Sequence, residues 1–356
     1  MIGRLKIRQT TEEREESLSP YAVKSRLSRG RRNYEEPCPI RTAFQRDRDR
    51  IIHCKAFRRL KHKTQVFIAP LGDHYVTRLT HTLEVAQIAR TIARALNLNE
   101  DLTEAIALGH DLGHTPFGHV GEEVLNEVYP RGFRHNEQSL RIVDLLEKDG
   151  RGLNLTSEVR DGILNHSKPR ADILGEGSGN PNTLEGQVCQ IADAIAYINH
   201  DIGDAVRAGV ITEGDLPLGP ICILGRLHSQ RINTMVSDVI ESSWAASGKV
   251  ATGIEPPPIG MSPPILEATN CLRDFLFERV YNERLAQEET GRAREVVRAL
   301  YRYFTEHADK MPLEYSFYSD DTERRVVDYI AGMTDQYALR MAEELSLIKR
   351  PENTVC

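Results

Sequence analysis

The sequence has few of the features that build membrane proteins, disulfide-linked proteins or β-sheets. No run approaches the roughly 20 apolar residues of a membrane span, and the opening residues MIGRLKIRQTTEEREE lack the apolar segment of a secretory signal. The six cysteines form no C-x-x-C pair and follow no regular spacing, which is typical of free thiols in a reducing compartment. We therefore expect a cytoplasmic protein with no membrane partner.

Aromatic residues and net positive charge are also scarce. Aromatic side chains make up 6% of the chain, and 46 basic residues are outnumbered by 52 acidic ones, giving a formal net charge of -6. Proteins that bind single-stranded nucleic acid combine a basic groove with stacking aromatics, so nucleic acid is not expected as the main partner. Arginines are dense only in residues 26–32 and 41–59, and we expect them to serve nucleotide phosphates or a subunit contact.

The apolar residues recur at intervals of three and four, which predicts an all-α fold. A helix over residues 79–96 has an apolar stripe that consists of Leu79, Leu83, Ala86, Ala89, Ala93 and Leu96. The apolar surface of this helix is widened by Val85, Ile88 and Ile92, so the helix is expected to be largely buried. Residues 183–206 predict a long helix with an inward face of Leu184, Val188, Ile191, Ile195 and Ile198. Further helices are predicted within 42–67, over 101–113, from about 119, and over 136–147.

Composition divides the chain into three parts. Residues 1–36 are polar and charged, and we expect a flexible or loosely packed N-terminal arm there. Residues 37–250 form the predicted core domain. The Gly/Pro-rich stretch GIEPPPIGMSPP is expected to be an exposed loop, and residues 265–350 a C-terminal helical region packed on the core. A second exposed loop is predicted at LGEGSGNPN.

Histidines are concentrated in one part of the chain, because seven of the twelve lie between His62 and His135. His81 lies within a buried helix, the pair His110-Asp111 ends another, and Asp193 interrupts the apolar stripe of a third. A single histidine on an apolar helix is more simply a hydrogen-bonded core residue. A buried carboxylate, however, is costly without a partner. Imidazole and carboxylate ligands together predict a divalent metal site for Mn, Mg, Fe, Co, Ni or Zn.

Several motifs carry a family resemblance. They are RTAFQRDRDRIIHCKAFRRLKHKTQVF, TRLTHTLEVAQIAR, GHDLGHTPFGHVGEEVL followed by RHNEQS, and DAIAYINHDIGDA. Over about residues 41–205 the chain resembles the bacterial dGTPase-like deoxynucleoside triphosphate triphosphohydrolases of the HD superfamily. The resemblance implies an HD-domain helical bundle with additional C-terminal helices. It also implies a metal site with the H…HD…D ligands His81, His110, Asp111 and Asp193.

The resemblance assigns catalytic positions to His114, His119 and Glu122. Hydrolysis at the α-phosphorus expels a nucleoside 5′-alkoxide, a poor leaving group that benefits from a proton donor. We expect His119 to be that donor, with Glu122 one turn later on the same face orienting its imidazole. Alternatively, His119 is an ordinary histidine at a helix start beside an acidic first turn. His135 and Glu137 belong to a motif that faces the same site.

Substrate contacts are expected on two further segments. Before the metal ligands, candidates for phosphate or sugar binding are Lys63, Gln65 and Arg78. Asp193, Tyr197 and Asp201 are spaced i, i+4, i+8 and share one helical face. Tyr197 is expected to exclude a 2′-hydroxyl, with Asp201 as its helper, although a tyrosine also commonly caps a core with its hydroxyl at the surface.

The resemblance thus implies hydrolysis of dGTP or other deoxynucleoside triphosphates to deoxynucleoside and triphosphate. It also implies a homo-oligomer and a possible deoxynucleotide effector. One alternative is a different HD-type nucleotidase or phosphodiesterase that shares the metal site. Another is a nucleic-acid-binding protein whose HD site only holds the fold.

Overall fold

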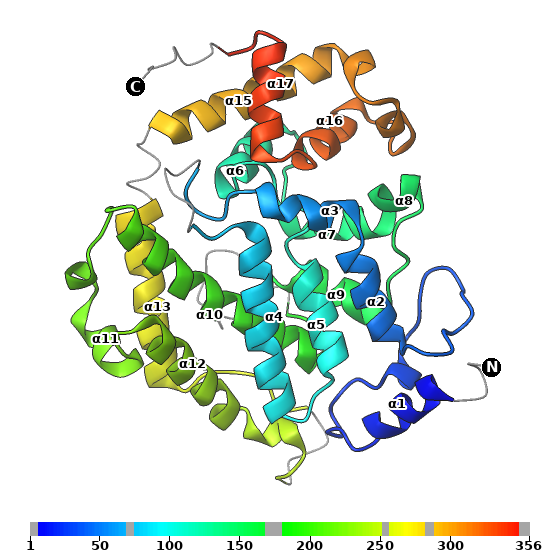
Figure 1. The fold of residues 1–356 in the computed structure, drawn as a ribbon, viewed down its shortest axis with the longest axis vertical. Coiled ribbons are helices and arrows are strands. Elements are labelled where there is room, and N and C mark those ends of the chain that lie inside the picture. The colour runs from blue at the N-terminus through cyan, green and yellow to red at the C-terminus, as the bar shows by residue number, and fades with distance from the viewer. Residues whose placement is uncertain (1–5, 69–74, 168–179, 251–255, 282–287, 349–356) are drawn as a thin grey trace.

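The computed structural model describes residues 6–68, 75–167, 180–250, 256–281 and 288–348 (Figure 1). Within these ranges the regular structure is helical, and β-pairing is limited to two isolated bridges, Arg31 with Thr156 and Thr64 with Thr77. The predicted all-α class is confirmed. Among the described helices none is long and apolar enough to cross a membrane.

The α-helices of the N-terminal half are α1 (Ile7–Glu15), α2 (Ala43–Ile52), α3 (Lys55–Arg59), α4 (Arg78–Ala95), α5 (Glu100–Gly109), α6 (His119–Val128), α7 (His135–Arg141), α8 (Glu147–Gly150) and α9 (Ser157–Asn165). Those of the C-terminal half are α10 (Leu184–Arg207), α11 (Leu218–Leu224), α12 (His228–Ser242), α13 (Pro263–Leu276), α15 (Glu288–Glu306), α16 (Thr322–Ala331) and α17 (Asp335–Glu344). Short π-helical stretches follow α7 and α13, at Ile142–Leu146 and Phe277–Tyr281.

Helices α4, α5 and α10 contact one another at the centre of the main core. Each begins at a polar side chain that accepts a backbone N–H from the first turn: Thr77 for α4, Asn99 for α5 and Thr183 for α10. The predicted inward face of α10 is confirmed, because all five of its apolar residues are buried. The predicted stripe of α4 is wrong at Leu83, which is 51% exposed. It lies outside the packed face, which is centred on Val85, Ile88 and Ile92.

Two helix ends differ from the sequence prediction. α5 ends at Gly109 instead of continuing to residue 113. Ser139 of α7 bonds the residues that follow α5. Its hydroxyl donates to the His110 carbonyl at 2.6 Å and accepts the Gly113 N–H at 2.8 Å. The charged pattern over 42–67 forms α2 and α3 and a 3-10 turn at Leu60–His62 before the chain becomes extended.

Residues 6–36 pack against the core instead of forming the expected flexible arm; residues 1–5 lie outside the described ranges. The Glu15 carboxylate is buried and accepts both the N–H and the hydroxyl of Ser25. Arg31 forms an ion pair with the buried Asp47. The polar composition did not predict this packing, because buried charged side chains such as Glu15 and Arg31 have partners within the fold. Four arginines of the 41–59 stretch are likewise ion-paired, including Arg50 with Glu35.

The C-terminal region does not pack as one unit. α13 joins the main core and contacts α11 and α10. Helices α15, α16 and α17 form a second hydrophobic core together with α6, and Figure 1 shows these helices grouped at one end of the molecule. Phe117 and Val124 from the N-terminal half are buried in this second core. The second core therefore lies directly behind the loop that precedes α6. The predicted loop at LGEGSGNPN lies mostly outside the described residues, as does part of GIEPPPIGMSPP.

Candidate active site

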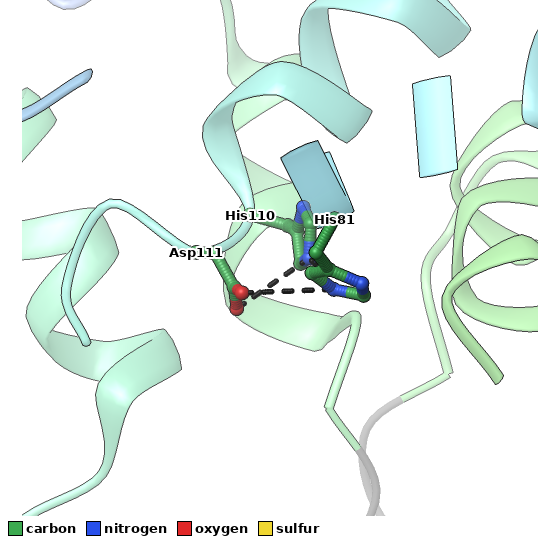
Figure 2. Close-up of side chains that lie close together, drawn as sticks. All are labelled: His81, His110 and Asp111. Carbon is green, nitrogen blue, oxygen red and sulfur yellow. Dashed lines mark hydrogen bonds and ion pairs between the residues drawn. The ribbon is translucent and has the colours of Figure 1, made fainter. Parts of the chain in front are cut away.

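Three parts of the main core bring the four predicted metal ligands together. His81 projects from α4, His110-Asp111 follows α5, and Asp193 lies on α10. The His81 Nε2 atom lies 3.4 Å from His110 Nε2, 3.7 Å from an Asp111 oxygen and 3.2 Å from an Asp193 oxygen. His110 Nε2 lies 3.4 Å from the other Asp111 oxygen. Figure 2 shows the His81, His110 and Asp111 side chains pointing toward one another.

The hydrogen bonds around the imidazoles fit a metal ion. His110 Nδ1 lies 2.6 Å from the Ala107 carbonyl oxygen, an acceptor, so this nitrogen carries the proton. A neutral His110 therefore presents an unprotonated Nε2 to the cluster. His81 Nδ1 similarly contacts His200 Nε2 at 2.9 Å, on the side away from the cluster. Nitrogen lone pairs and carboxylates that converge in this way suit a divalent metal ion, and His81, His110 and Asp111 are close enough together to hold one.

The electrostatics of the site favour ionised carboxylates. Burial raises the pKa of Asp111, but the neighbouring imidazoles and the Arg78 guanidinium outweigh it and hold this pKa well below its usual range. Burial also raises the pKa of Asp193, but the neighbouring imidazoles of His81 and His110 lower it overall. The Asp193 side chain is 23% exposed, so it is less buried than the sequence suggested. Its exposed edge is where the cluster meets solvent.

The predicted catalytic residues form a second cluster beside the first. Glu122 lies 3.4 Å from His119 Nδ1 and 2.9 Å from His135 Nδ1. The ring of His114 stacks on that of His135, with centroids 4.0 Å apart, and His114 Nε2 lies 3.3 Å from an Asp111 oxygen. His119 is 69% exposed, whereas His114 is buried. The two clusters are therefore joined through Asp111 and His114.

The pKa shifts differ along this second cluster. Burial raises the pKa of Glu122, but His135 and the hydrogen bond with His119 lower it well below the usual range. Burial lowers the pKa of His135, but the Glu122 carboxylate raises it overall. Burial and Arg78 hold the pKa of His114 well below the usual histidine value. The half-buried Glu122 and the buried His135 therefore favour each other's charged form, whereas the buried His114 favours its neutral form.

The loop between the two clusters has an unusual backbone. Phe117 has φ 63° and Gly118 has φ 60°. A Cβ on Gly118 would lie 3.1 Å from the Thr64 carbonyl oxygen and 3.2 Å from both the Gln65 carbonyl oxygen and an Arg78 guanidinium nitrogen. Glycine is therefore required here by both conformation and space. The predicted bend is confirmed, and this close approach of two chain segments fixes its shape.

Two of the predicted substrate contacts lie inside the fold. The guanidinium of Arg78 is buried and donates to Asp111 at 2.9 Å and to the Thr64 carbonyl at 3.1 Å. Lys63 is also buried, donates to the carbonyls of His114 and Ala331, and has its pKa lowered by burial to about 7. In the structure both cations hold the site together instead of facing a phosphate. The sequence could not show this because their partners lie far along the chain.

The remaining predicted substrate contacts are Gln65, Tyr197 and Asp201. Gln65 is buried, and its side-chain oxygen has no hydrogen-bond partner among the described residues. Tyr197 is half-buried on α10, one turn beyond Asp193, and burial together with Asp193 raises its pKa. Asp201 is 2% exposed; it contacts the Tyr281 hydroxyl and lies 2.8 Å from His200 Nδ1. Its carboxylate is therefore already engaged within the protein.

Sequence reasoning missed two histidines of this region. His166 follows α9, is buried, and lies 3.2 Å from His135 through their Nε2 atoms. Together with His110 and Asp193 it forms another group of ligand atoms within 4.8 Å. His200 supports His81 from behind. Both lie outside the histidine-dense stretch, and only the neighbouring site residues on α10 could have pointed to His200. Glu137, which the sequence grouped with His135, is exposed.

Two family profiles match the chain. The HD domain matches residues 78–198, which contain all four predicted metal ligands, and the phosphohydrolase-associated domain matches residues 259–344. Fold and site together define an HD-domain protein.

Relatives named "Deoxyguanosinetriphosphate triphosphohydrolase-like protein" narrow this class. The relative from Caldanaerobacter subterraneus subsp. tengcongensis is 61% identical over 346 residues, which cover 96% of each chain. The relative from Desulfatibacillum aliphaticivorans is 49% identical and covers 95% of this chain and 97% of its own. The relative from Clostridium tetani is 48% identical and covers 98% of both. The chain belongs to the deoxyguanosinetriphosphate triphosphohydrolase-like family of the HD superfamily.

Proposed function

We propose that this protein is a hydrolase that cleaves deoxynucleoside triphosphates into deoxynucleoside and inorganic triphosphate. The observation that carries the proposal is the pairing of a four-ligand metal cluster with a histidine–carboxylate cluster through Asp111 and His114. The first cluster suits a phosphate group and the second suits proton transfer. Membership of the family named above supports the choice of nucleotide.

The metal ligands in this proposal are His81, His110, Asp111 and Asp193. A bound divalent ion supplies Lewis-acid polarisation of phosphate oxygens. The remaining roles, orientation and proton transfer, belong to protein side chains. Arg78 fixes the orientation of the Asp111 carboxylate through its 2.9 Å hydrogen bond.

Proton transfer in this proposal belongs to His119. Its exposed imidazole can reach a substrate in solvent, and Glu122 at 3.4 Å from Nδ1 orients the ring. His119 then donates a proton to the departing 5′-oxygen of the nucleoside. The buried, neutral His114 is a hydrogen-bonding group for a phosphate oxygen, and His135 holds the Glu122 carboxylate in place.

Sugar selection in this proposal belongs to α10 and the segment before α4. Tyr197 excludes the 2′-hydroxyl, and the unpartnered oxygen of Gln65 accepts a hydrogen bond from a sugar hydroxyl. Asp201 assists indirectly, because it holds the Tyr281 hydroxyl beside this helix. The family resemblance further supports a homo-oligomer, a deoxynucleotide effector and a cytoplasmic location.

The test is product analysis with each of the four common deoxynucleoside triphosphates and Mn or Mg. The proposal predicts equal amounts of deoxynucleoside and inorganic triphosphate from at least one substrate. It also predicts that Asp111→Ala loses both bound metal and turnover, because the ion loses an anionic ligand. Release of monophosphate, pyrophosphate or orthophosphate would instead indicate a different HD-type nucleotidase or phosphodiesterase. Salt-sensitive DNA binding without turnover would indicate a nucleic-acid-binding protein.

A further inference from the structure

The loop that carries His114 and precedes His119 is tied to the C-terminal helices through one carboxylate. Asp335 is the first residue of α17. One of its oxygens accepts the Phe117 N–H at 2.9 Å, and the other accepts both the N–H of Thr64, at 2.8 Å, and the Thr64 hydroxyl. A single side chain from the end of the molecule therefore holds the loop between the two clusters and also the segment that contains Gln65.

The Phe117 N–H is a sensitive place for such a contact. Phe117 adopts a left-handed backbone conformation that bulky L-residues avoid. Its ring is almost fully buried in the second hydrophobic core, so the side chain cannot relax the strain by moving into solvent. Strained backbone persists only where the surroundings over-determine it. Asp335 supplies a directional anchor for that conformation, in addition to the packing of the ring.

Other contacts tie the site to the same helices. Lys63 joins the carbonyl oxygen of His114 to that of Ala331, the last residue of α16. The buried Asp328 of α16 accepts from Gln138 at 3.0 Å and from Arg141 at 2.7 Å, and both partners belong to the helix that begins with His135. The backbone around His114 and the helix of His135 are thus held from the second core.

The metal ligands are held in a different way. They come from α4, α10 and the end of α5, which pack in the main core, and none of them hydrogen-bonds to Asp335 in the described part of the chain. Asp335 is linked to Asp111 only indirectly, through Thr64 and the Arg78 guanidinium. Loss of the Asp335 contacts should therefore disturb the proton-transfer cluster while leaving metal binding intact.

We propose that Asp335 is a positioning residue for the reaction: it fixes the 114–118 loop so that His114 and His119 face the metal cluster in the reactive geometry. The C-terminal region thereby completes the active site rather than only stabilising the fold. The kinetic consequence rests on the proposed function, because it concerns turnover of a deoxynucleoside triphosphate. The structural consequence, a loop anchored by Asp335, does not depend on it.

The test substitutes Asp335→Asn, which keeps the shape of the side chain. In either orientation of the amide, at least one backbone N–H loses its acceptor, because the amide nitrogen can only donate. The matched control is Thr334→Ala. Thr334 caps the same helix by accepting the Tyr337 N–H and forms no hydrogen bond with either site segment within the described residues. Its loss weakens α17 without releasing the loop.

We expect Asp335→Asn to lower kcat about ten- to a hundred-fold, the scale of a small misplacement of catalytic groups, with a smaller change in KM and full metal content. Thr334→Ala should keep kcat within about twofold of the wild-type value. It should lower the midpoint of thermal unfolding at least as much as Asp335→Asn does. Hydrogen–deuterium exchange needs no substrate and should be faster over residues 113–118 in Asp335→Asn alone.

Unchanged exchange over residues 113–118 in Asp335→Asn would overturn the anchoring proposal, as would an equal loss of kcat in Thr334→Ala. If the wild-type protein turned over no deoxynucleoside triphosphate, the proposed function would fail. The exchange comparison would still decide whether Asp335 anchors the loop. The two failures are therefore distinguishable.

Discussion

Nδ1 of His81 lies 2.9 Å from Nε2 of His200, and Nδ1 of His200 lies 2.8 Å from a carboxylate oxygen of Asp201. When His81 offers Nε2 to a metal ion, its Nδ1 carries the proton and His200 must accept it. With His200 neutral, the contact between His81 and His200 would fix the tautomer of this predicted metal ligand from behind, as outer-shell partners commonly do.

This arrangement predicts that His200→Phe weakens metal binding. The phenyl ring fills the same buried space but cannot accept the His81 proton, so affinity should fall about ten- to a hundred-fold. His200→Gln is the matched variant, because its side-chain oxygen can replace Nε2 as acceptor, and it should lose less. Titration with Mn in competition with a chelator gives both values. Wild-type affinity in His200→Phe would show that the contact has no influence on the ion.

Proton donation by His119 predicts a selective loss of rate. His119→Ala should lower kcat by about a hundred- to ten-thousand-fold, with a much smaller change in KM, because this exposed side chain lies outside the metal cluster. His307→Ala is a control at another exposed histidine. His307 lies far from His119 in sequence and contacts Tyr303, four residues before it. Steady-state kinetics on the preferred substrate separate the parameters. A variant with normal kcat and raised KM would make His119 a phosphate contact.

A steric gate at Tyr197 predicts a preference for deoxyribose that depends on the ring. The ratio of kcat/KM for dGTP over GTP should narrow by about tenfold or more in Tyr197→Ala. Tyr197→Phe keeps the ring and should keep the ratio. If wild type used both sugars equally, or if Tyr197→Ala kept the wild-type ratio, Tyr197 would be only a half-buried core residue.

Glu185 makes the stability of the fold depend on pH. It is fully buried; one oxygen accepts the N–H groups of Val23 and Asn99, and the other has no partner among the described residues. Burial raises its pKa from 4.5 to about 7. Between these values the folded protein keeps a proton that the unfolded chain releases, so a rise in pH favours unfolding.

Glu185→Gln removes this titration and should flatten the dependence of the unfolding free energy on pH. A shift of this size corresponds to a contribution on the order of 3 kcal/mol that is complete below about pH 4.5 and lost above about pH 7. Denaturant unfolding of both proteins at pH 5 and pH 8 measures the difference. If the unfolding free energy changed equally between pH 5 and pH 8 in both proteins, the pKa of Glu185 would be the same in the folded and unfolded states.

Part of this molecule could be predicted from sequence because its signals are local. The inward face of α10 follows from helical periodicity, and the metal ligands follow from polar residues that interrupt apolar helices. The start of α6 at His119 was predicted from the bend before it. Such inferences need only neighbouring residues, and the structure places the other three predicted ligands within 3.7 Å of His81 Nε2.

The remaining features depend on partners that are distant in sequence. Arg78 seemed suited to phosphate, but its guanidinium bonds Asp111 and Thr64. The N-terminal segment seemed too polar to pack, but Glu15 and Arg31 are satisfied inside the fold. Asp335 lies 218 positions from Phe117, and no local pattern marks that contact. Charge alone cannot show whether a side chain faces a ligand or another part of the chain.

Hydrolysis in water enriched in ¹⁸O tests most directly whether water attacks the α-phosphorus of a deoxynucleoside triphosphate at this site. Water attack there breaks the bond between phosphorus and the 5′-oxygen. The account predicts one ¹⁸O atom in the released triphosphate, none in the deoxynucleoside, and no product from Asp111→Ala. Label in the 5′-hydroxyl of the deoxynucleoside, or release of deoxynucleoside monophosphate with pyrophosphate, would contradict it.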